Sequence, residues 1–336
     1  MSRSVHLVGS VPLADTDAVF TTCCEVLGDN LKRVPDGETG ERTNWIAWQR
    51  PLLGSHEALE IAGSMQNAEV AMPRLRVRDD FEGPLEFHNL GYRDAALQSF
   101  ERFRALKADG KIGAQRFQVS LPTPLAIVAA YVEPEHQSRV FAPYHARLLE
   151  ELVEIRETIP ASDLAIQWDV AIEFAVLEGL FPVWFDNPFD VIADQLSELG
   201  DAVPDDVEMG FHFCYGDAGN KHFKEPDDMA LLAKLGTAVS ERTSRFIDWI
   251  HMPVPIERDD ETYFRPLSEI KLKPGCELFL GLIHEQDGIE GTTKRIETAK
   301  KFRPEFGIAT ECGLGRRDPT IIPDLLKLHT DLSNLS

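Results

Sequence analysis

Residues 207–214 read VEMGFHFC, a short apolar run rich in β-forming residues that ends in a histidine and a cysteine. Similar runs recur along the 336-residue chain, and stretches with helical periodicity separate most of them. The eight candidate strands are residues 5–11, 31–35, 116–121, 164–170, 207–214, 245–252, 277–283 and 306–311. Strand–helix alternation repeated eight times is typical of an α/β fold, the (β/α)8 TIM barrel. The sequence therefore predicts such a barrel.

The segments between these runs include amphipathic helices at residues 144–158, 227–243 and 291–302. The connection at 43–113, after the second strand, is far longer than an ordinary βα loop, so we expect it to contain helices at 56–66 and 93–107. The prediction is one TIM-barrel catalytic domain over residues 1–336 with a helical insertion at 43–113. An open doubly wound sheet is the alternative, but no Gly-x-Gly-x-x-Gly turn follows the first strand.

The composition is that of an acidic globular protein. Its 34 basic and 56 acidic residues give a formal charge of −22, which disfavours non-specific binding to nucleic acid or to an anionic membrane. No apolar run approaches the ~20 residues needed to cross a bilayer, and no signal peptide is visible. The cysteines are Cys23, Cys24, Cys214, Cys276 and Cys312. An odd number at irregular spacing indicates reduced thiols in a cytoplasmic protein.

Residues able to bind a metal ion or a proton follow the ends of the predicted strands. Barrel enzymes carry out their chemistry at the C-terminal ends of the strands, so side chains at these positions meet at one rim. The residues concerned are Glu38, Asp169, His212, Cys214, His251, His284 and Cys312. Their common placement predicts a single active site at that rim.

His212 and Cys214 form the centre of a predicted zinc site. Residues i and i+2 of an extended strand point the same way, so both side chains can reach one ion. Zinc favours thiolate and imidazole ligands in tetrahedral geometry, and a catalytic site leaves one position open. Cys312 can supply a second thiolate, and His251 a further imidazole. A lone His-x-Cys pair is a weak motif, and a core histidine beside an inert cysteine is the alternative.

The segments Gly-Phe-His212-Phe-Cys214-Tyr and Glu311-Cys312-Gly-Leu-Gly-Arg-Arg are the most specific in the chain. They resemble the His-x-Cys-Tyr and Asp-Cys-Gly-Leu-Lys-Thr-Arg segments in the C-terminal catalytic barrel of cobalamin-independent methionine synthase. Further likenesses follow in order at Val8-Gly9-Ser10-Val11-Pro12, Asp36-Gly37-Glu38, Leu121-Pro122-Thr123-Pro124 and Ile166-Gln167-Trp168-Asp169. The resemblance spans nearly the whole chain and fits the short members of the family, which have a single barrel.

The resemblance implies roles for the residues that match. It implies a zinc ion held by His212, Cys214 and Cys312. It also implies that Glu38 and Asp169 bind the amino group of an amino-acid substrate, and that Gly9 and Ser10 bind its carboxylate. Arg42, in a segment similar to the family's Glu-Arg-Asn, is a further substrate-binding candidate for an anionic group, as are Arg316 and Arg317.

Three positions depart from the family pattern. The family's glutamate zinc ligand falls at His251, which can itself bind zinc, and Glu257, six residues on, is the alternative. The second acid of the family's Asp-Glu-Pro-Ala segment is missing after Asp169. The family's Asp-x-His segment, whose histidine donates a proton, reads Ile283-His284-Glu285-Gln286. We therefore take His284, together with Asp169, as the catalytic residues.

These features predict a zinc-dependent methyl or alkyl transferase in which a zinc-bound thiolate is the nucleophile. Its partners would be a small thiol or amino-acid-like substrate and a methyl donor, either a folate or a corrinoid protein. The missing acid and the shifted His284 motivate one alternative, a zinc lyase or demethylase that cleaves a C–S or C–O bond. A barrel that binds a small molecule without turnover is the other.

Overall fold

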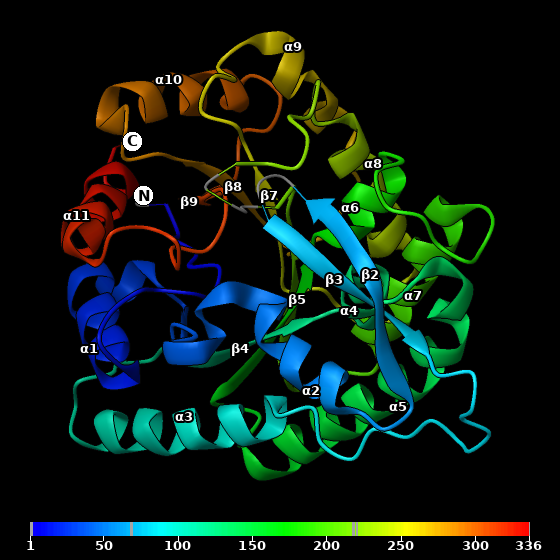
Figure 1. Ribbon diagram of the computed structural model, residues 1–336. Coiled ribbons are helices and arrows are strands. Elements are labelled where there is room, and N and C mark those ends of the chain that lie inside the picture. The colour runs from blue at the N-terminus through cyan, green and yellow to red at the C-terminus, as the bar shows by residue number, and fades with distance from the viewer. Residues whose placement is uncertain (1–2, 68–69, 217–218, 220, 336) are drawn as a thin grey trace.

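The computed structural model of this protein describes residues 3–67, 70–216, 219 and 221–335. Its centre is a parallel sheet of seven strands in the order β1-β4-β5-β6-β7-β8-β9, which curls into a half-barrel. Helices surround this sheet, and a two-stranded hairpin crosses in front of it (Figure 1). The architecture is an α/β fold compatible with a TIM-like barrel.

The strands of the sheet are β1 (Arg33–Pro35), β4 (Arg116–Pro122), β5 (Leu164–Val170), β6 (Glu208–Phe213), β7 (Trp249–Pro253), β8 (Glu277–Ile283) and β9 (Gly307–Thr310), and the hairpin consists of β2 (Leu59–Asn67) and β3 (Val70–Val77). The α-helices are α1 (Thr16–Leu27), α2 (Gln49–Ser55), α3 (Tyr92–Ala108), α4 (Pro124–Tyr131), α5 (Pro134–Thr158), α6 (Ile172–Leu177), α7 (Pro188–Asp201), α8 (Ala230–Arg242), α9 (Glu261–Phe264), α10 (Gly288–Lys300) and α11 (Ile322–Ser333). Short 3-10 helices are η1 (Gly28–Asn30), η2 (Gly40–Trp48), η3 (Arg265–Glu269) and η4 (Pro319–Ile321). Within the described residues, no helix combines the length and the apolar character that crossing a membrane requires.

Strand pairing brings predicted site residues side by side. Seven of the eight predicted strands are confirmed, and β5 and β8 have the predicted bounds. Every residue of β5 is buried, as is typical of a parallel strand with a neighbour on each edge and helices outside. The register pairs Asp169 on β5 with His212 on β6, and His212 with His251 on β7. Three of the predicted site residues therefore form one row at the ends of adjacent strands.

The first predicted strand, residues 5–11, is not a continuous strand. Val5 makes isolated parallel bridges to Leu31 and to Ile308, and Ser10 makes one to Gly37. The backbone N–H of His6 donates to the carbonyl oxygen of Ile308 at 3.0 Å. This segment therefore contacts both edges of the sheet, beside β1 and at β9, without forming a regular ladder.

The insertion after β1 contains a β-hairpin as well as helices. The predicted helix at 93–107 is confirmed as α3. The predicted helix at 56–66 is wrong, because most of these residues belong to β2, which pairs with β3 in antiparallel fashion. The backbone groups that a helix would satisfy internally are instead paired across the hairpin. Tertiary pairing thus decides the structure of this segment.

Candidate metal centre

The structure brings His212, Cys214 and Cys312 together where β6 and β9 end. The Sγ atoms of the two cysteines lie 3.5 Å apart, and Sγ of Cys312 lies 4.0 Å from Nε2 of His212. One ligand atom from each residue lies within 4.8 Å of the others, and among the described residues this is the one such cluster of at least three. All five cysteines of the chain are free thiols. One imidazole and two thiols at this spacing suit zinc.

His251 contacts His212 and the backbone. Its Nδ1 lies 2.7 Å from Nδ1 of His212, and its Nε2 lies 3.0 Å from the carbonyl oxygen of Thr310. Burial lowers the pKa of both imidazoles. The pKa of His212 falls well below its usual value, and the pKa of His251 falls to about 3. His251 lies outside the cluster of three, and Glu257, the alternative ligand, is exposed.

A glycine allows the Cys312 segment to pack against the N-terminal segment. A Cβ atom at Gly313 would lie 2.4 Å from Oγ of Ser10, so a side chain there would force the Ser10 hydroxyl to move. The backbone N–H of Leu314 donates to the carbonyl oxygen of Ser10 at 2.7 Å, and that of Gly315 donates to Oγ of Ser10 at 3.2 Å. These contacts fix the position of Cys312 relative to Ser10.

A pocket of about 480 Å3, counting its open mouth, lies at the cluster. Its lining consists of Val8, Gly9, Ser10, Glu38, Thr43, Trp45, Asp169, Ala171, His212, Cys214, Gly216, Cys312, Gly313 and Arg316. Most of the residues predicted to bind substrate or metal therefore face one cavity.

Two acidic groups share this pocket. Burial raises the pKa of Asp169 well above its usual value, and the nearby charge of Glu38 adds to the effect. Burial likewise raises the pKa of Glu38 to about 7, although the positive charge of Arg42 opposes the shift. A bound ammonium group would favour the ionised form of both carboxyl groups, so the pair is suited to bind a cationic group.

Gln167 orients Asp169, a role that the sequence analysis did not assign. Its Nε2 donates to Oδ1 of Asp169 at 2.9 Å, and its Oε1 lies 2.8 Å from Nε2 of His6. The spacing of two residues on β5, which turns both side chains to the same face, was the available signal. Trp45 also lines the pocket from a left-handed backbone conformation (φ 46°), which no pattern in the sequence indicated.

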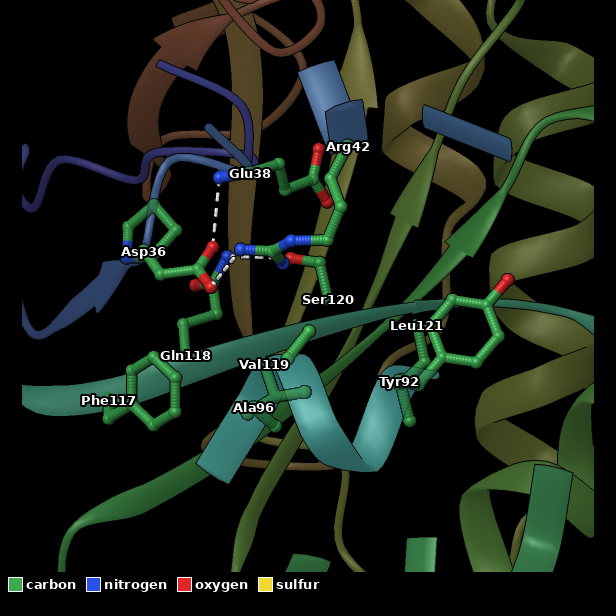
Figure 2. Close-up of a pocket in the computed structure, with 12 residues that line it drawn as sticks. Asp36, Glu38, Arg42, Tyr92, Ala96, Phe117, Gln118, Val119, Ser120 and Leu121 are labelled. Atoms are coloured by element: carbon green, nitrogen blue, oxygen red, sulfur yellow. Dashed lines mark hydrogen bonds and ion pairs between the residues drawn. The ribbon is translucent and has the colours of Figure 1, made fainter. Parts of the chain in front are cut away.

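Arg42 lines a neighbouring cavity rather than the pocket at the cysteines. Its Nη2 donates to Oδ2 of Asp36 at 2.6 Å, and Ser99 donates to the same oxygen. Figure 2 shows the guanidinium turned toward Asp36, with Glu38 beside it. Glu38 lines both cavities, so Arg42 influences the pocket through its charge on Glu38.

His284 is buried near Glu311 and is not among the residues that line the pocket. Its Nε2 lies 2.9 Å from the carbonyl oxygen of Val254, and its Nδ1 lies 4.0 Å from Oε1 of Glu311. Burial lowers the pKa of His284 to about 4. A second histidine, His222, lies next to the other carboxylate oxygen of Glu311, with its Nε2 3.4 Å from Oε2 of that residue. Burial lowers the pKa of His222, but the hydrogen bond with Glu225 and the charge of Glu311 outweigh the effect of burial and raise this pKa to about 9. The catalytic role of His284 stays a prediction.

No protein-family model and no curated protein matches the sequence. A Listeria monocytogenes protein assigned as a vitamin-B12-independent methionine synthase is similar in structure, with a TM-score of 0.60, 14% identity, and coverage of 99% of this chain and 98% of that one. A B12-independent methionine synthase from Shewanella sp. W3-18-1, in complex with selenomethionine, has a TM-score of 0.58, 16% identity, and coverage of 100% and 97%. A methyltransferase from Methanosarcina mazei has a TM-score of 0.51, 12% identity, and coverage of 99% and 94%. At these identities the likeness establishes that the chain shares its fold with these proteins along nearly its whole length.

Proposed function

We propose that this protein is a zinc-dependent methyl or alkyl transferase that acts on a thiol substrate. The observation that carries the proposal is the cluster of His212, Cys214 and Cys312 on a fold shared with methionine synthases and a methyltransferase. Two thiolates and a neutral imidazole balance the 2+ charge of zinc and leave a fourth position open. When bound, zinc lowers the pKa of a thiol, so that a nucleophilic thiolate is present at neutral pH.

The rest of the substrate is proposed to lie against the two acidic groups of the pocket. Glu38 and Asp169 would bind an ammonium group, and the ammonium charge would in turn favour their ionised forms. Gly9 and Ser10 would bind a carboxylate, while Arg42 supports the ionised form of Glu38. The selenomethionine in the Shewanella structure supports an amino-acid-like substrate. The proposed methyl donor is a folate or a corrinoid protein.

Proton transfer is assigned to His284 in this proposal. Its Nδ1 lies 4.0 Å from Oε1 of Glu311, the residue before Cys312, so one carboxylate is next to both this imidazole and a candidate metal ligand. The low pKa of His284 makes it neutral at neutral pH, with a nitrogen available to accept a proton if Nε2 donates to Val254.

Metal analysis of the purified protein tests the proposal first. Wild-type protein should contain about one zinc ion per chain, as three clustered donors imply. Cys214→Ser and Cys312→Ser should each lose the zinc and the activity together, because each removes a thiolate. Cys276→Ser, at a buried cysteine before β8, is the matched control and should retain both. Folded wild-type protein that binds no zinc would contradict the proposal.

X-ray absorption at the zinc edge tests thiol binding. Adding homocysteine to zinc-loaded protein should increase the number of sulfur atoms around the metal by one, because the substrate sulfur takes the open position. The same measurement with cysteine and with methionine separates the requirement for a thiol from that for an amino acid. An unchanged spectrum with every thiol would count against thiol activation and leave the lyase alternative.

A further inference from the structure

Two buried histidines meet through the same type of atom beside the candidate metal centre. Nδ1 of His212 lies 2.7 Å from Nδ1 of His251, and the two residues are 3% and 0% exposed. A hydrogen bond between two Nδ1 atoms needs a proton on one and a lone pair on the other. A charged imidazole is costly at such a buried position, so each ring is neutral and carries one N–H.

The backbone of Thr310 decides which histidine donates. Its carbonyl oxygen lies 3.0 Å from Nε2 of His251 and can only accept, so the proton of His251 is on Nε2. Nδ1 of His251 is then the acceptor, and Nδ1 of His212 carries the donated proton. Nε2 of His212 is left with a lone pair, and this atom lies 4.0 Å from Sγ of Cys312.

We infer that His251 is a positioning residue, which holds His212 in the tautomer that can bind a metal ion through Nε2. Both ring nitrogens of His251 are engaged, one by His212 and one by Thr310, so His251 supports a ligand instead of being one. The inference deepens the proposed function and rests on it only for the identity of the ion. Partners of this kind change metal affinity by about 10–100-fold when they are removed.

Thr310 links this arrangement to the second part of the cluster. It ends β9, and its hydroxyl donates to the carbonyl oxygen of Cys312 at 2.7 Å. The carbonyl group of Thr310 therefore sets the tautomer of His212 through His251. The hydroxyl of the same residue holds the turn that carries Cys312. Imidazole and thiol are positioned together by one strand end.

The tautomers can be read directly in metal-free protein by long-range 1H–15N NMR with 15N-labelled histidine. Wild-type protein should show His212 protonated on Nδ1 and His251 protonated on Nε2. The opposite pair of tautomers would overturn the inference, and this result depends neither on zinc nor on catalysis. His251→Phe should leave His212 as a mixture of tautomers, because its acceptor is gone.

Two further variants control for indirect effects. An asparagine oxygen can take the place of Nδ1, so His251→Asn should restore the Nδ1-protonated form of His212. His329→Asn, at a buried histidine whose Nδ1 lies 2.7 Å from the carbonyl oxygen of Leu325 in α11, should leave His212 unchanged. A His251→Phe variant with the wild-type tautomer of His212 would show that His251 does not set it.

Zinc affinity, measured by competition with a chelator, gives a second readout. His251→Phe should still bind one zinc ion, about 10–100-fold more weakly, and His251→Asn should lie between it and the wild type. Folded His251→Phe that binds no zinc at saturation would identify His251 as a ligand and overturn the inference. Failure of the wild type to bind zinc would contradict the proposed function, while the tautomer measurement would still decide the role of His251.

Discussion

Among single residues, Glu173 illustrates how burial at a strand end controls protonation. It lies on α6 just after β5, is 1% exposed, and accepts a hydrogen bond from the hydroxyl of Thr123. Burial raises its pKa from 4.5 to about 7. The folded protein thus keeps a proton that the unfolded chain releases between these values. Its contribution to stability is complete below pH 4.5 and is lost as the pH rises through 7.

Glu173→Gln should remove this pH dependence, because the amide keeps an oxygen for Thr123 but does not ionise. Between pH 5 and pH 8 the free energy of unfolding of the wild type should fall relative to the variant by up to about 3 kcal/mol, because the pKa rises from 4.5 to about 7 on folding. Urea unfolding at several pH values measures this difference. Glu150→Gln, at a side chain that is 65% exposed, is the control. Parallel pH profiles for the wild type and Glu173→Gln would disprove the assignment.

The sequence identifies which residues gather at the site better than it identifies what each one does. The i, i+2 rule predicts that His212 and Cys214 face one point, and the structure brings Cys312 to them. Its place at the end of the next predicted strand selects His251 as well, whose surroundings depend on the carbonyl oxygen of Thr310, 59 residues away. A backbone acceptor leaves no mark in the sequence, so its effect on a side chain emerges only from the fold.

Among the elements, the hairpin β2–β3 is anchored by one buried side chain. Arg74 on β3 is 3% exposed, and its guanidinium donates to the carbonyl oxygen of Ala129 at 2.7 Å and to those of Ala130 and Val132. These carbonyl groups lie at the C-terminal end of α4, where backbone acceptors lack partners within the helix. Arg74 therefore caps α4 and holds the hairpin to this helix.

Arg74→Met should release the hairpin while it retains much of the apolar bulk of the side chain. Loss of the hydrogen bonds from a charged donor should reduce the free energy of unfolding by about 1.5–3 kcal/mol, and limited proteolysis should cut first within 59–77. Arg76→Met, on the same strand but 42% exposed and paired with Glu60, is the control and should change neither result. Wild-type protease resistance in Arg74→Met would show that other contacts anchor the hairpin.

The wrong helix prediction at 56–66 has a physical origin in the same hairpin. Residues 61–64 of β2 are all exposed, so no alternation of buried and exposed positions marks the strand. Pairing with β3 determines the conformation of β2. This pairing depends on a second segment, so the residues of β2 alone do not reveal it. By contrast, β5 and β8 are almost wholly buried, and their apolar runs predict both strands at the observed bounds.

In the molecule as a whole, the N-terminal segment links the two edges of the sheet. The backbone N–H of Arg3 donates to the carbonyl oxygen of Ser333 in α11 at 2.8 Å, so the first described residues lie beside the last helix (Figure 1). The carbonyl oxygen of Val8 accepts hydrogen bonds from the side-chain amides of Gln118 at 2.9 Å and Gln167 at 2.5 Å. Side chains thus satisfy a carbonyl group of this irregular segment. We infer that this segment holds the two edges of the curled sheet together.

Leu7→Ala tests whether the edges of the sheet depend on this segment. Leu7 is 1% exposed, and the lost side chain should lower the free energy of unfolding by about 2–5 kcal/mol. The N–H of Ile308 donates to the carbonyl oxygen of Ser4 at 2.9 Å, so amide hydrogens of β9 should exchange with solvent faster in the variant, while those of β5, at the sheet centre, should change less. Hydrogen-exchange mass spectrometry measures both, and Leu180→Ala, at a residue 45% exposed, is the control. If exchange instead rises equally in β5 and β9, Leu7 is an ordinary core residue, and the edges of the sheet do not depend on the N-terminal segment.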